Sequence, residues 1–282
     1  MSYTTLISTN ELVAHLGAPG VRIVDCRFSL ADKTAGCVAY KAAHIPGAVY
    51  ANLDEDLSAP RSANGAGGRH PLPTPEAFAS ILSDWGIDNE TQVIAYDDGS
   101  GAMAARLWWM LRWLGHDRVA VLDGGWLAWQ GERRPVESQS LTPFPTNFVP
   151  HPRPEMVVDV EKVFGYTASG GALLIDARAP DRFRGENETI DPVGGHIPGA
   201  TNYFYGNNLA DGRFRSPDEL AAAFRSLIGQ RSATEVVMYC GSGVTACHNL
   251  LAMEHAGLGL ARLYSGSWSD WISDPRRPQA RG

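Results

Sequence analysis

Short apolar runs alternate with longer amphipathic stretches along most of the chain. Runs of four or five mostly apolar residues predict strands at residues 22–25, 92–96, 119–122 and 235–239. The spacing of apolar residues predicts helices at residues 103–114 and from Thr245 to about Ala256, each followed by a glycine. Short, fully apolar strands are typical of parallel sheets covered by helices on both faces. The pattern therefore predicts an α/β fold with right-handed crossovers.

Four sequence blocks occur twice in the chain, in the same order. An apolar strand with an Asp-x-Arg motif is followed by a His-Ile-Pro-Gly-Ala block, a strand ending in tyrosine, and a Gly-x-Trp block. The two copies begin at Ile23 and Leu174 and end at Trp129 and Trp271. Because these copies are too long for solenoid repeats, they indicate a duplicated domain.

A proline-rich segment separates the two copies. Prolines occur at positions 135, 143, 145, 150, 152 and 154, without helical or strand periodicity. We interpret residues 135–154 as an extended linker. We therefore expect an N-terminal domain at residues 1–134 and a C-terminal domain at residues 155–282.

Composition narrows the class of protein. The 282 residues are 44% hydrophobic and 20% charged, as in an ordinary two-domain globular protein. The net charge of −7 argues against a nucleic-acid or acidic-membrane partner.

No apolar run reaches transmembrane length, and the start Met1-Ser2-Tyr3 lacks a signal-peptide pattern, so we expect a cytoplasmic protein. The four cysteines are too irregularly spaced for a disulfide framework or a zinc site, and we expect neither metal nor cofactor.

The strongest candidate for chemistry is Cys240, between the predicted strand at 235–239 and the helix from Thr245. Gly241 and Gly243 can adopt backbone angles denied to other residues, so the loop can form an anion-binding nest of N–H groups. The helix N-terminus adds partial positive charge, which favours ionisation of a cysteine to the nucleophilic thiolate. The alternative is a buried structural cysteine followed by a glycine turn.

The loop after Cys240 contains no lysine or arginine. A tyrosine-phosphatase-like loop needs an arginine six positions after the cysteine, and Ala246 occupies that position, so phosphatase chemistry is disfavoured. Neutral donors suit a single negative charge, such as that of a persulfide. These donors are the side chain of Ser242 and the backbone N–H groups of Gly241, Gly243, Val244 and Thr245.

The first half of the chain carries Asp97 where the second half carries Cys240. The sequence Asp97-Asp98-Gly99-Ser100-Gly101 keeps the glycine turn and loses the sulfur nucleophile. We interpret the two carboxylates as caps of the following helix rather than as a metal site. The N-terminal domain is therefore expected to be catalytically silent.

Together, the duplicated blocks and the single cysteine loop resemble the tandem-domain rhodaneses, which are thiosulfate and 3-mercaptopyruvate sulfurtransferases. The resemblance extends from about Ser8 to Trp271. It implies two rhodanese-like domains, each a parallel sheet flanked by helices on both faces. It also implies a ping-pong reaction in which Cys240 takes a sulfane sulfur from a small-molecule donor. The resulting persulfide passes the sulfur to cyanide, a thiol or a reduced dithiol protein. A monomer is expected, since the two halves can bury an interface with each other.

The two residues that follow Cys240 also indicate which sulfur donor the protein uses. Thiosulfate-type members typically carry Arg and Lys after the cysteine, whereas Gly241 and Ser242 resemble the mercaptopyruvate type. In that type the loop serine is proposed to relay a proton with a histidine. Ser242 matches the serine and His44 matches the histidine, which would make both catalytic with Cys240. Alternatively, His44 only stabilises its loop, as its repeat partner His196 would.

Arg182 matches the family's arginine for the anionic group of the donor. In the alternative interpretation, Arg182 forms a surface ion pair with Glu186 or Asp181. Mercaptopyruvate-type members usually carry a second arginine nine residues after the first, and here that residue is Asp191. This departure weakens the mercaptopyruvate assignment unless a group such as Arg184 substitutes.

Two other functions remain open at this stage. The protein could be a thiosulfate sulfurtransferase, or a persulfide carrier or redox-sensing module without its own small-molecule turnover. Arg182 discriminates against the carrier, because a carrier needs no donor anion site. Cys247 is interpreted as a small core residue, with a redox disulfide to Cys240 as the alternative.

Overall fold

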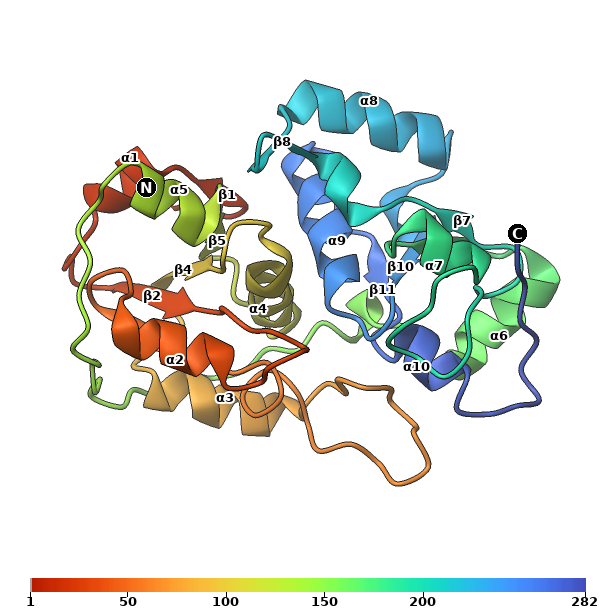
Figure 1. Cartoon of the computed structure of the whole chain (residues 1–282), viewed down its shortest axis with the longest axis horizontal. Coiled ribbons are helices and arrows are strands. Elements are labelled where there is room, and N and C mark those ends of the chain that lie inside the picture. The colour runs from red at the N-terminus through yellow and green to blue at the C-terminus, as the bar shows by residue number, and fades with distance from the viewer. Residues whose placement is uncertain (1) are drawn as a thin grey trace. The chain divides into compact units, whose positions relative to one another are not determined.

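The computed structural model describes residues 2–282, which form two α/β units (Figure 1). Unit 1 contains the residues up to Ala59, Pro73–Arg153 and Asp211–Arg213. Unit 2 contains Pro60–Leu72, Pro154–Ala210 and Phe214–Gly282. The sequence division places residues 60–72 in the first domain, whereas the structure packs them with unit 2. This loop therefore contributes side chains to the unit that contains Cys240.

Unit 1 is built on a five-stranded parallel sheet with the order β1-β5-β4-β2-β3. Its strands are β1 (Leu6–Ile7), β2 (Val21–Asp25), β3 (Ala48–Tyr50), β4 (Gln92–Tyr96) and β5 (Val119–Leu122). Its helices are α1 (Thr9–Val13), α2 (Ala35–Ala42), α3 (Pro75–Asp84), α4 (Ala102–Trp113) and α5 (Gly125–Gly131). Ile23, Ile94 and Tyr96 on one face pack into a hydrophobic cluster with residues of α1, α2 and α5. Figure 1 shows α1 and α5 on one side of this sheet and α3 on the other.

Unit 2 is built on a four-stranded parallel sheet with the order β11-β10-β6-β7. Its strands are β6 (Leu173–Asp176), β7 (Thr201–Asn202), β10 (Val236–Tyr239) and β11 (Arg262–Leu263). Two further strands, β8 (Leu209–Ala210) and β9 (Arg213–Phe214), form a separate pair, and β9 contains the boundary between Arg213 of unit 1 and Phe214 of unit 2. The α-helices are α6 (Val160–Ser169), α7 (Pro180–Arg184), α8 (Pro217–Ile228), α9 (Thr245–His255) and α10 (Ser267–Trp271). Val163 of α6 and Trp268 of α10 join the core on one face, and Figure 1 shows α8 and α9 on the other side.

The predicted elements agree closely with the observed ones. Strands predicted at 92–96 and 119–122 match β4 and β5, and α9 begins at the predicted Thr245. The segment between Gly131 and Pro154 contains no helix or strand, as its prolines predict. The α/β class with parallel sheets is confirmed in both units. Among residues 2–282, none of the helices has the length and apolar character required to cross a membrane.

The repeated Asp-x-Arg motif makes the same contacts in both units. The Arg27 guanidinium donates hydrogen bonds to the Asp25 carboxylate at 2.6–3.0 Å. Arg178 does the same to Asp176 at 2.6–3.1 Å. Each arginine also donates to the backbone carbonyl that precedes the His-Ile-Pro-Gly block. Because both units share these buried contacts, the motif is structural, and chemistry is expected where the units differ.

The loop after β4 shows one such difference. The Asp97 side chain is buried, and its carboxylate accepts the backbone N–H groups of Gly99, Gly101 and Met103 at 2.8–3.0 Å. Burial raises the pKa of Asp97, while these N–H donors act in the opposite direction. The predicted capping role is therefore confirmed for Asp97, whereas the exposed Asp98 side chain accepts none of the hydrogen bonds of residues 2–282. The same contacts show that a loop of this design can surround one anionic group with N–H donors.

Replacing Asp97 with alanine is expected to destabilise the protein by about 3 kcal/mol, because several buried N–H groups lose their acceptor. Urea unfolding followed by circular dichroism would measure the change. Asp98→Ala is the matched control, since Asp98 is the exposed neighbour on the same loop. Equal losses of unfolding free energy in the two variants would contradict the capping role.

Candidate active site

Cys240 lies on the loop between β10 and α9, at the carboxyl end of a parallel strand. Its side chain is only 2% exposed, and Sγ accepts the N–H of Gly243 at 3.2 Å. Gly243 has φ +76°, and a Cβ there would lie 2.3 Å from the Ser265 carbonyl oxygen. Only glycine fits this position. The predicted strand, glycine turn and helix therefore place an N–H group directly against the sulfur.

Other backbone contacts fix the Cys240 loop against α10. The Cys240 N–H donates to Ser267 Oγ at 3.1 Å, and the Cys240 carbonyl accepts the Trp268 N–H at 3.0 Å. In unit 1, the Asp97 carbonyl accepts the Trp126 N–H in the same way, at 2.8 Å. The two loops therefore share one framework and differ in the group placed inside it, a carboxylate in one and a thiol in the other.

Ser242, the second residue after Cys240, contacts a histidine. Its Oγ lies 2.8 Å from Nδ1 of His70, and both side chains are buried. His70 belongs to the loop Pro60–Leu72 of unit 2 and was not among the residues predicted from the sequence. A hydroxyl and an imidazole at this distance can exchange a proton.

The loop that carries His70 is anchored to the start of α10. The Gly67 N–H donates to the Asp270 carboxylate at 3.0 Å, and the Arg69 N–H donates to Ser269 Oγ at 2.9 Å. A Cβ at Gly68, where φ is +78°, would lie 2.3 Å from the Gly266 carbonyl oxygen. The glycines before Arg69 thus permit a close approach to α10, and this approach positions the following two side chains beside the Cys240 loop.

A sequence signal for this loop exists in the comparison of the two repeats. His44 and Val93 are 49 residues apart (93 − 44), whereas the equivalent His196 and Val236 are 40 apart (236 − 196). The first copy is therefore nine residues longer in the stretch that contains Gly67-Gly68-Arg69-His70. An insertion that is rich in glycine and in ionisable residues, and that only one repeat carries, is a candidate for part of the active site.

His44, the histidine expected to act with Ser242, lies in unit 1. It is completely buried, its ring stacks on Tyr40 at 4.0 Å between centroids, and Nδ1 lies 2.6 Å from the Tyr40 carbonyl oxygen. Its repeat partner His196 stacks on Phe183 at 3.7 Å, with Nδ1 2.9 Å from that residue's carbonyl oxygen. These equivalent contacts favour the alternative role of stabilising the loop. A catalytic role for His44 stays a prediction.

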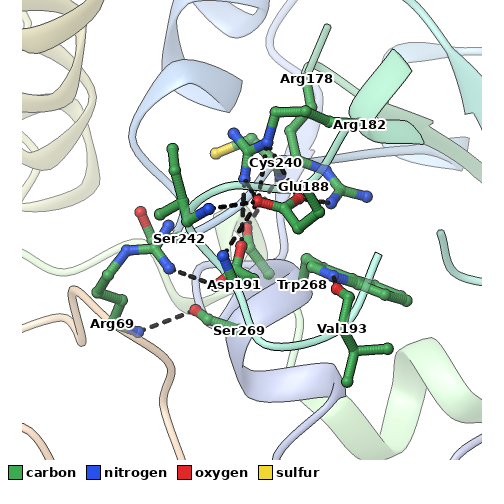
Figure 2. Close-up of polar contacts among 12 residues, drawn as sticks. Arg69, Arg178, Arg182, Glu188, Asp191, Val193, Cys240, Ser242, Trp268 and Ser269 are labelled. Atoms are coloured by element: carbon green, nitrogen blue, oxygen red, sulfur yellow. Dashed lines mark hydrogen bonds and ion pairs between the residues drawn. The ribbon is translucent and has the colours of Figure 1, made fainter. Parts of the chain in front are cut away.

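Arg182, on the short helix α7, takes part in a cluster of ion pairs (Figure 2). Its guanidinium donates to both oxygens of Glu188 at 2.8–3.1 Å and to Asp191 at 3.2 Å. The surface partners considered from the sequence, Asp181 and Glu186, do not pair with this guanidinium among the ion pairs of residues 2–282. Glu186 instead pairs with the exposed Arg184 at 2.7 Å. Arg182 is the arginine of α7 that faces the Cys240 loop, since a Cβ on Gly241 would lie 3.6 Å from its Nη2.

Asp191 connects this cluster to the loop that carries His70. One carboxylate oxygen pairs with Arg69 and the other with Arg182, and the side chain is 2% exposed. Burial raises the pKa of Asp191, and the charge of Arg69 opposes this shift. Figure 2 shows Arg69 and Arg182 approaching Asp191 from two different segments of unit 2.

Cys247 lies inside α9 and is completely buried, with Sγ 3.3 Å from the Gly243 carbonyl oxygen. Cys240 and Cys247 are both free thiols. The burial supports the interpretation of Cys247 as a core residue.

The chain matches known proteins over its whole length. A family described as "Rhodanese-like domain" matches residues 8–132 and 165–274. A probable 3-mercaptopyruvate sulfurtransferase of Pseudomonas aeruginosa is 48% identical, with 100% of both chains covered. A putative thiosulfate sulfurtransferase, SseB of Mycobacterium tuberculosis, is 39% identical over 98% of this chain and 97% of its own.

Solved structures agree with these sequence matches. The 3-mercaptopyruvate sulfurtransferase from Leishmania major superimposes with a TM-score of 0.84 at 34% identity, covering 98% of this chain and 75% of its own. SseA from Escherichia coli, described as a 3-mercaptopyruvate sulfotransferase, gives a TM-score of 0.82 at 33% identity, covering 94% of this chain and 99% of its own. Fold, cysteine loop and full-length similarity lead to one conclusion: this chain belongs to the rhodanese family of sulfurtransferases and carries the rhodanese-like domain twice.

Proposed function

We propose that this enzyme transfers a sulfane sulfur from 3-mercaptopyruvate to a thiol or cyanide through a persulfide on Cys240. The observation that carries the proposal is the uncharged Cys240 loop, in which Ser242 contacts His70 at 2.8 Å. Gly241 and Ser242 stand where a thiosulfate enzyme is expected to carry fixed positive charge. The relatives with mercaptopyruvate in their names add support.

In the first half-reaction, the Cys240 thiolate attacks the sulfur of the donor. The carbon–sulfur bond breaks, and its electron pair stays on the three-carbon fragment as an enolate. The proton of the donor thiol ends on that fragment, which leaves as pyruvate. The products are one pyruvate and one Cys240 persulfide anion. The Ser242–His70 pair supplies a route for this proton, and loop N–H groups such as that of Gly243 stabilise the sulfur anion.

In the second half-reaction, an acceptor attacks the outer sulfur of the persulfide. The sulfur–sulfur bond breaks, its electron pair returns to Cys240 as a thiolate, and the acceptor leaves as a hydropersulfide or as thiocyanate. No metal or other cofactor is required, because the Cys240 thiolate is the nucleophile of the first half-reaction and the leaving group of the second. The loop amides of Gly241, Gly243, Val244 and Thr245 are the proposed binding groups for the transferred sulfur.

The second candidate function is thiosulfate sulfurtransfer. One observation favours it: a Cβ at Gly241 would lie 3.0 Å from Arg69 Nη2 and 3.6 Å from Arg182 Nη2. Two guanidinium groups near the nucleophile could attract a dianion even though the loop is uncharged. The opposing carboxylates of Glu188 and Asp191 reduce this attraction. For this reason we propose mercaptopyruvate, rather than thiosulfate, as the better donor.

The test is kcat/KM for 3-mercaptopyruvate and for thiosulfate, measured side by side with one thiol acceptor. The proposal expects mercaptopyruvate to be the better donor by about tenfold or more. Equal or better use of thiosulfate would establish the second candidate. Persulfide formation on Cys240 without turnover of either donor would establish the carrier function.

Replacing Arg182 with alanine is expected to lower kcat/KM about 10–100-fold with either donor, because each is an anion and loses a charged hydrogen bond. Steady-state kinetics with both donors would measure this. Arg184→Ala is the matched control on α7, because Arg184 is exposed and pairs with Glu186. Full activity of the Arg182 variant with both donors would remove it from the donor site.

We also propose that the enzyme acts as a monomer in the cytoplasm. All four cysteines are free thiols, which suits a reducing compartment. Each unit has its own hydrophobic core, so neither needs a second chain to bury its apolar side chains. Light scattering of the purified protein and fractionation of cells would test both statements.

A further inference from the structure

Arg69 lies in the Gly67–His70 stretch and faces the residue that follows the nucleophile. Its backbone N–H is fixed by Ser269, while its guanidinium pairs with Asp191. A Cβ on Gly241 would lie 3.0 Å from Arg69 Nη2. The buried Arg69 Nε has no hydrogen-bond partner among residues 2–282. This guanidinium therefore has donor capacity left beside the Cys240 loop.

Charge in the surrounding cluster is balanced almost residue by residue. Arg178 is engaged by the buried Asp176, its motif partner, at 2.6 Å, and it also pairs more distantly with Glu188 at 3.4 Å. Apart from that pair, two guanidinium groups, Arg69 and Arg182, face two carboxylates, Glu188 and Asp191. A donor carboxylate entering this cluster therefore meets two cations that are already oriented. Their own carboxylates keep the free site from carrying excess positive charge.

We propose that Arg69 is the second cation of the donor site, where it binds the carboxylate of a 2-oxo acid together with Arg182. Residue 191, where the family resemblance leads one to expect an arginine, carries instead the carboxylate that orients Arg69. The charge absent at position 191 is thus supplied from the loop Pro60–Leu72. Asp191 acts as a positioning residue for both guanidinium groups. This inference rests on the proposed mercaptopyruvate donor and names the residues that recognise its carboxylate.

The first test uses alkylation of Cys240, which does not depend on any sulfur donor. Iodoacetate carries a carboxylate and iodoacetamide does not, so the ratio of their rates at Cys240 reports carboxylate recognition. Mass spectrometry of the peptide containing Cys240 separates this reaction from alkylation of Cys37, which is partly exposed. Arg69→Gln is expected to lower the iodoacetate-to-iodoacetamide ratio about tenfold, and Arg69→Lys to lower it less.

Arg184→Gln is the matched control, since Arg184 is the other arginine considered as a substitute for the missing cation. Its alkylation ratio is expected to equal that of the wild type. The proposal is overturned if Arg69→Gln leaves the ratio unchanged, or if Arg184→Gln lowers it as much. An unchanged rate with neutral iodoacetamide shows that the loop around Cys240 has stayed intact in the Arg69 variant.

The second test separates donor binding from a purely structural ion pair. Arg69→Gln is expected to raise KM for mercaptopyruvate about tenfold with a smaller change in kcat. If Arg69 served only to neutralise Asp191, the double variant Arg69→Gln, Asp191→Asn would recover the wild-type KM. The proposal expects the double variant to keep the raised KM, because it still lacks the second cation. Recovery of KM would overturn the proposal.

The two tests also separate this inference from the proposed function. If the wild type does not use mercaptopyruvate, the proposed donor is wrong, while the alkylation ratio still reports on Arg69. If mercaptopyruvate is used and the ratio is the same in Arg69→Gln and wild type, only the Arg69 inference is wrong.

Discussion

Cys240→Ser is expected to abolish sulfur transfer, lowering kcat/KM for mercaptopyruvate on the order of 10⁴-fold or more. A serine hydroxyl cannot form the persulfide that both half-reactions share. The fold should be unaffected, because Gly243 and the backbone contacts of residue 240 to α10 set the loop. Intact-mass spectrometry after donor addition should show one extra sulfur in the wild type and none in the variant.

Cys37→Ser is the control for this experiment, because Cys37 is the partly exposed thiol of unit 1. It should keep both the activity and the added sulfur. Peptide mapping would then locate the persulfide. An extra sulfur found mainly on Cys26, Cys37 or Cys247 would contradict the assignment of Cys240, and circular dichroism would exclude unfolding as the reason for lost activity.

The duplicated framework could be predicted from the sequence because its signals are local and occur twice. The runs at 119–122 and 235–239 predicted β5 at its observed bounds and β10 to within one residue, and the glycine turn after Cys240 predicted the start of α9. The Asp-x-Arg and His-Ile-Pro-Gly blocks make equivalent contacts in the two units. Residues shared by the two repeats are therefore those that the fold requires. A position where the repeats differ is a candidate for chemistry, and Cys240, which stands where unit 1 has Asp97, is such a position.

The polar surroundings of Cys240 could not be predicted in the same way. His70 and Ser242 are 172 positions apart in sequence, and no periodic pattern relates them. His44 is the histidine that the family resemblance matches to the proton relay, although the repeat places His196 in the equivalent block. The residues that contact the Cys240 loop, such as His70, come from an insertion that is present in the first copy only. An alignment of the two repeats therefore gives them no equivalent residue.

Asp191 illustrates a second limit of reading residues singly. In the sequence it is a carboxylate in place of an expected arginine, which argues against a 2-oxo acid donor. In the structure it pairs with Arg69 and Arg182, so its charge orients cations rather than replacing one. Local spacing also suggested Asp181 or Glu186 as partners of Arg182, whereas the turn after α7 brings Glu188 to it. The net charge that a site presents to a donor depends on which arginines and carboxylates form ion pairs, and these ion pairs depend on the fold.

Ser242→Ala and His70→Gln are each expected to slow persulfide formation from mercaptopyruvate about 10²–10⁴-fold, the usual range for lost proton transfer. Release of pyruvate requires a proton to move from the donor thiol to the leaving carbon fragment. Thiosulfate requires no such proton, because its sulfur–sulfur bond breaks to give sulfite directly. Persulfide formation from thiosulfate should therefore change less than tenfold in both variants. Single-turnover kinetics with each donor would measure the two rates.

The comparison between donors separates proton transfer from damage to the site. If the Ser242–His70 contact were only structural, its loss would disturb Cys240 itself and slow both donors equally. Because the two groups lie 2.8 Å apart and act as one unit, the double variant should be no slower than the slower single variant. His44→Gln tests the other histidine: a loss confined to mercaptopyruvate in that variant, with normal rates in His70→Gln, would transfer the proton relay to His44. We expect the reverse, since Ser242 has His70 as its observed partner and His44 makes contacts equivalent to those of its repeat partner His196.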